Sequence, residues 1–180
     1  MTVIDHCLVE EVPARSLDRR TKARSKARDI GRGCEWLRLV VLQHEEIEDS
    51  FDRLRDVAHL ASAQDEERVL AALLTAHAIA KEAVLYPAMA NAQQRAHAVA
   101  ACIGQSRIKI QLAALERLDS TASDYREALA RLAETFSEQV FDEECSWFPA
   151  LARTGDAALQ ARLSARFVAE YQRYLGFDIA

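Results

Sequence analysis

The sequence predicts an all-α protein built as an up-down bundle of four helices, and three observations lead to this prediction. The chain has 180 residues, of which 50% are hydrophobic, so it is long enough to bury one good core. It contains only 5 glycines and 3 prolines, which leaves few residues for tight turns between strands. Apolar residues recur at three- and four-residue spacings through long segments, as they do on the buried face of a helix.

The first two helices are expected over residues 34–60 and from residue 65 to near Pro87. The first follows Gly31 and Gly33, and apolar residues at helical spacing give it one buried face. That face holds Leu37, Val40, Val41, Ile47, Phe51 and Leu54. The second begins with an acidic triplet, which suits a helix start, and Pro87 is expected to disturb its end. Its inward residues are Leu70, Leu73, Leu74, Val84 and Leu85.

Three further helices complete the predicted bundle. The third runs over residues 93–118, and the polar residues 119–124 are expected to form a turn and an N-cap. The fourth covers residues 125–151 and meets Pro149 near its end. A short fifth helix over residues 156–175 is expected to pack across the others. Four long helices with short connections favour an up-down bundle, in which ligands project inward from facing helices.

A basic arm precedes this bundle. Residues 1–30 are expected to form the arm and residues 31–180 the bundle, whose core is residues 34–155. The basic residues of the arm are Arg15, Arg19, Arg20, Lys22, Arg24, Lys26 and Arg28. The net charge of -5 shows that the rest of the chain is acidic. Two interpretations remain open, a flexible or solvated arm that lies on its own acidic body, and an arm that binds an acidic partner, nucleic acid or an anionic membrane surface.

The remaining composition favours a soluble, cytoplasmic protein. The acidic N-terminus does not resemble a signal peptide, and no transmembrane segment is expected, because no run of 18 apolar residues occurs. The 4 cysteines lie far apart and are expected to be free thiols. No hydrolase, transferase or dehydrogenase motif occurs, so the sequence gives no sign of an enzyme. A homodimer is a further expectation, which an exposed apolar stripe on the fifth helix would support.

One polar pair on each long helix is predicted to lie inside the bundle. Residues four apart share a helical face, and each pair lies on an apolar stripe. The pairs are His44 with Glu48, His77 with Lys81, Gln105 with Lys109, and Gln139 with Glu143. Such a buried polar cluster must be satisfied by a metal, by ion pairs or by water, since unpaired buried charge is costly.

Two of these pairs open similar phrases in the second and fourth helices. The phrase that starts at His77, H-x-x-x-K-E-A-V-L-Y-P-A-M, parallels the phrase that starts at Gln139, Q-x-x-x-E-E-C-S-W-F-P-A-L. Both resemble the hemerythrin-like (HHE cation-binding) family, which shows H-x-x-x-E followed by Leu-Tyr-Pro or Leu-Phe-Pro on both helices. The resemblance covers about residues 30–155, and His44 in Leu-Gln-His-Glu-Glu-Ile matches the family's ligand on the first helix.

In that family, five histidines and two bridging carboxylates hold two irons that bind oxygen or react with oxygen or nitric oxide. The resemblance places His44, His77 and Glu143 at ligand positions. The other ligand positions are altered: Lys81 replaces a bridging carboxylate, and Gln105, Lys109 and Gln139 stand where ligands belong on the third and fourth helices. A complete di-iron centre is therefore not expected.

The first functional hypothesis is a mononuclear non-heme iron site. His44, His77 and Glu143 form a set of two histidines and one carboxylate, which suits Fe(II) with open positions. The candidate additional ligands are Glu48, Glu82 and Glu144. This site would bind or sense a small diatomic ligand, oxygen or nitric oxide, or respond to redox state.

The second hypothesis is a binding or scaffold module without a metal. Lys81 and Lys109 bring two positive charges into the predicted cluster, while Glu48 and Glu143 bring two negative charges. These ion pairs would replace the di-iron centre, and the glutamines can donate and accept hydrogen bonds without charge.

Overall fold

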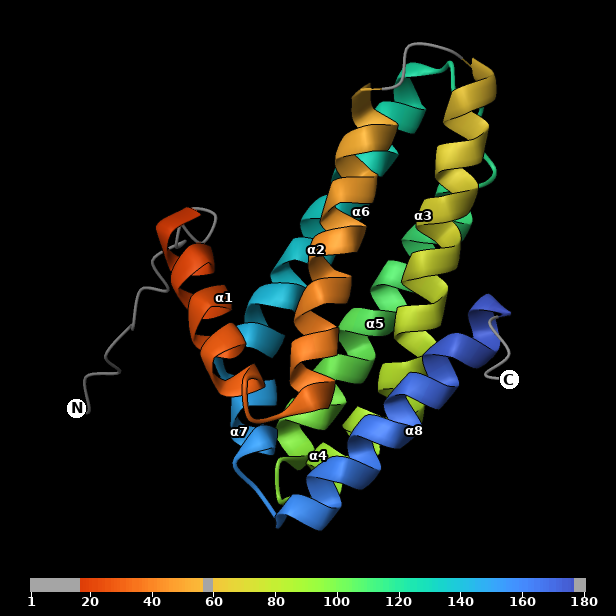
Figure 1. Cartoon of the computed structure of the whole chain (residues 1–180). Coiled ribbons are helices and arrows are strands. Elements are labelled where there is room, and N and C mark those ends of the chain that lie inside the picture. Colours follow the sequence, from red (N-terminus) through yellow and green to blue (C-terminus); the bar gives the residue numbers. More distant parts are fainter. Residues whose placement is uncertain (1–16, 57–59, 177–180) are drawn as a thin grey trace, which may run out of the picture.

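The computed structural model describes residues 17–56 and 60–176, apart from the side chains of residues 60–62. The described part of the chain contains helices and no strand, which confirms the all-α prediction (Figure 1). Four long helical segments run alternately up and down as a bundle, and a shorter helix lies on each of two sides. The protein is thus an up-down four-helix bundle with two additional helices.

The first two long segments are α2 (Glu35–Asp56) and a continuous run of α3 (Leu60–Ala80), η1 (Lys81–Leu85) and α4 (Tyr86–Asn91). The second helix begins earlier than the sequence predicts, because Asp65 and its acidic neighbours are tolerated inside a helix at its exposed side. It also continues beyond Pro87. The preceding π-helical turn has wider hydrogen-bond spacing and accommodates a residue without an N–H group.

The other two long segments repeat this plan. They are α5 (Arg95–Leu115) and a run of α6 (Ser123–Asp142), η2 (Glu143–Trp147) and α7 (Phe148–Ala152). The N-cap of α6 is Ala122, which has no capping side chain, so the predicted polar cap is wrong. Asp119 instead stabilises the preceding turn by accepting hydrogen bonds from the backbone N–H and the hydroxyl of Thr121.

The two π turns stand at equivalent places in the internal repeat. The turn η1 begins at Lys81, four residues after His77, and η2 begins at Glu143, four residues after Gln139. A proline follows each turn in the next helix. The two segments with similar sequence phrases therefore also have equivalent backbone structure. Single π turns are rare and frequently mark functional sites.

The apolar core is divided into two clusters with a polar layer between them. One cluster, at the end of the bundle near α4 and α7, is built around Trp36, Leu85 and Phe148. The other, toward the opposite end, includes Ile47 and Phe136. His44 lies on α2 between Val41 of the first cluster and Ile47 of the second. The polar layer is therefore shielded by apolar residues on both sides.

The fifth helix predicted from the sequence is α8 (Ala157–Leu175), which lies obliquely against α2 and α3 (Figure 1). Asp156 caps it by accepting a hydrogen bond of 2.8 Å from the backbone N–H of Leu159. Leu163 and Phe167 are the buried residues of α8 and join the first apolar cluster. The helix thus closes one side of the bundle at the level of the first cluster.

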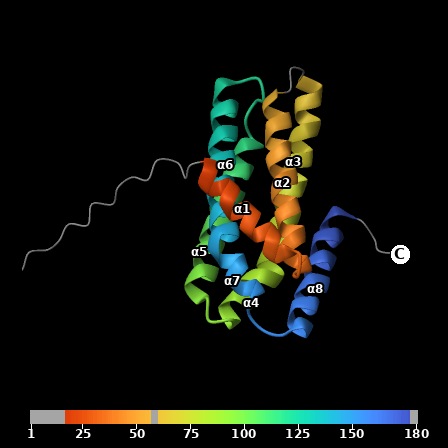
Figure 2. The same ribbon diagram turned by 60° about the vertical axis from the view of Figure 1, so that its left-hand side comes forward.

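The basic segment forms a helix as well. Residues Leu17–Gly31 form α1, which lies across α2 and the α6–α7 segment (Figure 2). Its buried residues are small, Ala23, Ala27 and Gly31, so burial of apolar side chains contributes little to its docking. Two arginines instead form ion pairs with acidic residues of the bundle. Arg15, the one arginine of the predicted arm before Leu17, lies outside the described residues.

One stretch of the described chain, Ala63–Asn91, is long and apolar enough to cross a membrane by composition alone, with a mean hydropathy of 1.5. However, 61% of that window is buried inside the protein. The central helix of a bundle has the same composition, because it contacts other helices on several sides.

Three cysteines in the described residues, Cys34, Cys102 and Cys145, are free thiols as the sequence predicts.

Candidate metal centre

The polar layer contains two histidines from neighbouring helices. His44 of α2 and His77 of α3 are both fully or almost fully buried, and their ring centroids lie 4.9 Å apart. Glu143 lies at the start of η2 and is also buried. One ligand atom from each of these three residues lies within 4.8 Å of the other two. The structure therefore brings together the three residues that the sequence places at ligand positions.

His77 is held in one orientation by its neighbour Gln43. The Nδ1 atom of His77 lies 2.8 Å from the amide oxygen of Gln43, so Nδ1 donates the proton in this pair. The Nε2 atom is buried and has no hydrogen-bond partner. Burial lowers the pKa of His77 well below its ordinary value, and the positive charges of Lys81 and His44 lower it further. His77 is therefore neutral and presents an unused lone pair at Nε2.

His44 lies between two carboxylates. Its Nδ1 atom is 2.8 Å from Glu144 Oε1, and its Nε2 atom is 3.1 Å from Glu143 Oε2. Burial by itself lowers the pKa of His44, but the hydrogen bonds and charges of Glu143 and Glu144 outweigh burial and raise it. The Nδ1 contact holds the ring in place, because a carboxylate that accepts from Nδ1–H fixes both the tautomer and the direction of Nε2.

Glu143 is the centre of the hydrogen-bond network. The ammonium group of Lys81, itself fully buried, lies 2.9 and 3.1 Å from its two oxygens. The hydroxyl of Tyr86 and the amide of Gln139 also donate to Oε1, at 3.0 and 2.9 Å. Burial opposes ionisation of Glu143, but Lys81 and His44 dominate and lower its pKa to about 2. Glu143 is therefore an ionised carboxylate.

Two of the donors to Glu143, Lys81 and Tyr86, differ in how burial shifts their pKa. Burial lowers the pKa of Lys81, and the neighbouring Glu143 charge offsets part of that change. Burial and the same charge raise the pKa of Tyr86 well above its ordinary value, so its phenol keeps the proton that it donates. The layer thus holds the Lys81 ammonium in direct contact with the Glu143 carboxylate, and the uncharged Tyr86 phenol and Gln139 amide donate to the same carboxylate.

A second arrangement links the layer to α1. The guanidinium of Arg24 donates to Glu144 at 3.0 and 3.1 Å and also binds both oxygens of Glu48. Burial lowers the pKa of Arg24, but its bonds to these two carboxylates dominate and raise it. The contacts form a chain from Arg24 through Glu144 to His44. Arg24, Glu48 and Glu144 are among the residues that line an open cleft of about 670 Å³ between α1, α2 and the α6–η2 segment.

Three residues predicted for the interior lie outside the layer. Glu48 faces α1 and pairs with Arg24, and its side chain is 34% exposed. Lys109 and Glu82 form an exposed ion pair with each other. Lys109 instead lies on the exposed side of α5, where its ammonium donates to the carboxylate of Glu82 in η1. These positions correct the prediction of four inward polar pairs.

Of the remaining predicted residues, Gln105 and Gln139 are buried in the layer as expected. Gln139 donates to Glu143, while Gln105 lies 3.5 Å from the hydroxyl of Tyr86. Glu144 is the one additional ligand candidate whose carboxylate contacts a histidine of the layer. It lies on the Nδ1 side of His44, so it supports the ring, whereas Glu143 contacts Nε2.

Sequence reasoning missed four residues of the site: Arg24, Gln43, Tyr86 and Gly104. A Cβ atom on Gly104 would lie 1.8 Å from the amide oxygen of Gln139, so this glycine makes room for the glutamine. Tyr86 stands in the quoted Leu-Tyr-Pro phrase, and Gln43 immediately precedes His44, which were available signals. Arg24 had no such signal, because its contacts join residues 24 and 120 positions apart.

The donor set of His44, His77 and Glu143 suits one transition-metal ion. Two imidazole nitrogens and one carboxylate oxygen are the ligand types found in mononuclear Fe(II) sites with open positions. The unpartnered Nε2 of His77 fits such an ion, because a ligand nitrogen must be deprotonated and directed by a bond at Nδ1. Among the described residues, His44, His77 and Glu143 are the one group of His, Cys, Asp or Glu side chains close enough together to hold an ion.

Comparison with known families finds one matching domain. Residues 37–151 match the hemerythrin HHE cation binding domain. The matched region extends from α2 to α7 and contains every buried residue of the polar layer. No curated protein and no solved structure matches this chain.

Proposed function

Because the chain belongs to the hemerythrin HHE cation-binding domain family, we propose that it binds a single iron ion through His44, His77 and Glu143. The observation that carries this proposal is the buried Nε2 of His77, which has no hydrogen-bond partner. A buried polar atom left unsatisfied costs about 1–3 kcal/mol. Coordination would remove this cost, and the Gln43 contact already holds the ring in the required tautomer.

The surroundings of the histidines support a ligand role. Each Nδ1 atom is fixed by an oxygen acceptor, Gln43 for His77 and Glu144 for His44. Such outer contacts orient metal-binding histidines and raise their basicity. Arg24 holds Glu144 in turn, so the direction of the His44 ring depends on a contact made by α1.

The altered residues restrict the site to one ion. Lys81 occupies the position from which a second carboxylate would bridge two metals, and an ammonium group cannot act as a ligand while it is protonated. Gln139 is committed to Glu143 through its amide. Lys81 and Tyr86 hold the Glu143 carboxylate in place, and the two apolar clusters exclude water above and below the layer.

Bound iron would supply a redox-active centre with open coordination positions. We therefore assign the site a role in binding or sensing oxygen, nitric oxide or redox state. The Lys81 ammonium has three N–H donors, of which two reach Glu143, so the third can stabilise a small anionic or polar ligand. The open cleft beside Glu144 offers solvent an approach to the outer side of the layer.

A second candidate function, a metal-free binding or scaffold module, is favoured by a different observation. Glu143 accepts hydrogen bonds from Lys81, Tyr86, Gln139 and His44, so its charge is satisfied without an ion. In this alternative the buried Lys81 and Glu143 pair replaces the metal, and the exposed surface carries the function. The two candidates differ in whether iron enters the layer.

Metal analysis tests the proposal. The full chain is expressed in iron-rich medium, purified without chelator or affinity tag, and measured for iron per chain. The same sample is exposed to oxygen and to nitric oxide while its visible spectrum is recorded. We expect one iron per chain and a spectral change with at least one gas. Two irons would refute the disabling effect of Lys81, and no iron after reconstitution would favour the metal-free module.

A matched pair of variants assigns the ligands. His77→Gln removes the candidate ligand nitrogen, and His97→Gln changes an exposed histidine of α5 that stacks on Trp147. We expect His77→Gln to lose iron and His97→Gln to retain it. Loss of iron in both variants, or in neither, would contradict the assignment of His77.

A further inference from the structure

Helix α5 has a second apolar face that points away from the bundle. Its inner face consists of residues such as Ala101, Ile108 and Leu112, which contact the bundle. On the outer side, Val99, Ile103 and Ile110 are 54%, 59% and 69% exposed. These are three of the eight exposed large apolar side chains in the described part of the chain, and they lie on one helix. A helix that is apolar on two faces is typical of a helix buried on both.

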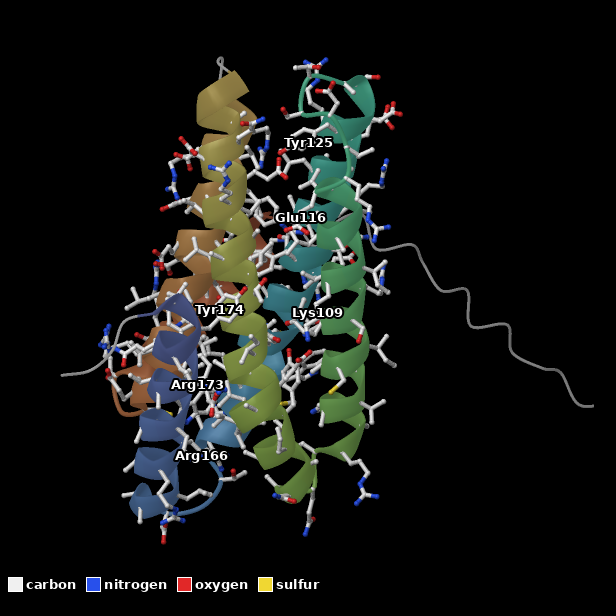
Figure 3. All side chains as sticks on the ribbon, turned by 90° about the vertical axis from the view of Figure 1, so that its right-hand side faces the viewer. Lys109, Glu116, Tyr125, Arg166, Arg173 and Tyr174 are labelled. Carbon is white, nitrogen blue, oxygen red and sulfur yellow. The ribbon has the colours of Figure 1, made fainter. Side chains whose placement is uncertain are left out.

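The outer face has the spacing of a helix-pairing seam. Val99, Ile103, Ser106 and Ile110 are separated by four, three and four residues, which is the alternation of a coiled-coil seam. Ala96 and Ala113 extend the same row toward both ends of the helix. An open apolar groove between this row and the η1–α4 segment adds to the exposed apolar surface. Figure 3 shows α5 at the edge of the bundle, with Lys109 and Glu116 on it.

The charges beside the seam select the partner. Arg95 lies at the start of α5, and Glu116 follows its last residue. Both side chains are exposed, and neither has an ion-pair partner among the residues that the structure describes. They lie 21 residues apart, a multiple of the seven-residue repeat, so they occupy the same edge of the seam. In an antiparallel pair of identical helices, equivalent edge positions face each other across the twofold axis.

The register of the charges agrees with the register of the apolar residues. The row from Val99 to Ile110 is centred between residues 104 and 105, and Arg95 and Glu116 are centred between 105 and 106. An antiparallel pairing with its twofold axis near residue 105 places Val99 near Ile110 of the second copy, and it places Arg95 near Glu116 of that copy. A parallel pairing would instead place Arg95 opposite the exposed Ala100. The charges therefore complement each other in the antiparallel arrangement.

We propose that the protein forms a twofold homodimer through an antiparallel pair of α5 helices, closed at both ends by an Arg95 and Glu116 ion pair. This surface differs from the one expected on the fifth helix, since Tyr174 is the exposed large apolar side chain of α8. The dimer leaves the polar layer intact, because the buried residues of α5, including Gln105, face the bundle. The proposal does not depend on iron binding.

The first test is the oligomeric state of the full chain by sedimentation velocity over a wide concentration range. We expect a reversible dimer. Ile103→Glu should raise the dissociation constant by at least about tenfold, because it buries a charge at the centre of the seam. Leu42→Glu is the matched control, since Leu42 is 48% exposed on α2 and lies outside the seam. A monomeric wild-type protein, or equal effects of the two substitutions, would overturn the proposal.

The second test uses the charges and distinguishes the orientation. Arg95→Glu places two glutamates at each end of the proposed dimer, and Glu116→Arg places two arginines there. Each variant should dissociate more readily than the wild-type protein, yet a mixture of the two should form a heterodimer in which each end again pairs one glutamate with one arginine. Absence of the heterodimer, with both variants still folded by circular dichroism, would overturn the antiparallel pairing.

Discussion

The α3–η1–α4 segment and the α6–η2–α7 segment have the same backbone plan with different polar side chains. Each has a buried polar residue, a π turn that begins four residues later, and a proline after the turn. The first carries His77 and Lys81, and the second carries Gln139 and Glu143. The family shows His followed by Glu on both, so each segment retains one member of that pair. The retained His77 and Glu143 belong to one candidate site, and the changed Lys81 binds Glu143.

This difference shows how positions 81 and 143, which are equivalent in the two segments, can form an ion pair in place of two carboxylates that bridge metal ions. Two carboxylates at positions 81 and 143 would repel each other in a buried layer unless cations lay between them. A lysine at one position supplies the positive charge from the protein itself. The layer can therefore remain folded without a metal while it keeps two histidines and one carboxylate for an ion.

The largest expected loss of stability comes from removing the negative charge of Glu143, which both the ion pair with Lys81 and the proposed metal site require. In the metal-free protein, Glu143→Gln leaves the buried ammonium of Lys81 without its counter-ion. Loss of one partner of a buried ion pair costs about 3–5 kcal/mol. We expect the free energy of unfolding in urea to fall by that amount. Glu134→Gln on the exposed side of α6 is the control and should change it little; comparable effects would argue against the buried pair.

A smaller effect is expected where α5 makes room for the second segment. Gly104→Ala places a methyl group against the Gln139 amide oxygen, although alanine by itself favours a helix. Overpacking of this kind costs about 1–3 kcal/mol. The double variant with Gln139→Ala removes the obstructing side chain and should recover much of the loss. Thermal unfolding of the three proteins measures this, and a stabilising Gly104→Ala would show that Gln139 has another position available.

The contact between α1 and the second segment should contribute less again. Arg24→Ala leaves Glu144, which is 2% exposed, with His44 as its remaining hydrogen-bond partner. We expect a loss of about 1–2 kcal/mol in unfolding free energy. Arg28→Ala removes an ion pair whose arginine is 59% exposed, so its cost should not exceed about 1 kcal/mol. Equal costs would mean that the buried Arg24 contact has no special role.

The sequence predicted the helices and the candidate ligands because both depend on local spacing. Apolar periodicity located the five main helices, and the repeated phrases located His77 and Glu143. The spacing of residues along one helix did not predict which side chains of other helices each polar residue contacts. Glu48 shares a helical face with His44, but α1 provides Arg24 beside it, and no local pattern reports that contact. The extent of the second helix through Pro87 depended on a π turn, which apolar spacing does not reveal.

The central claim is that the two segments contribute one histidine and one carboxylate to a single ion. Calorimetric titration of the metal-free protein with Fe(II) under anaerobic conditions tests it most directly, with wild-type protein and His77→Gln measured side by side. We predict a stoichiometry of one iron per chain for the wild-type protein and loss of that binding in the variant. A stoichiometry of two, or unchanged binding without His77, would contradict the account.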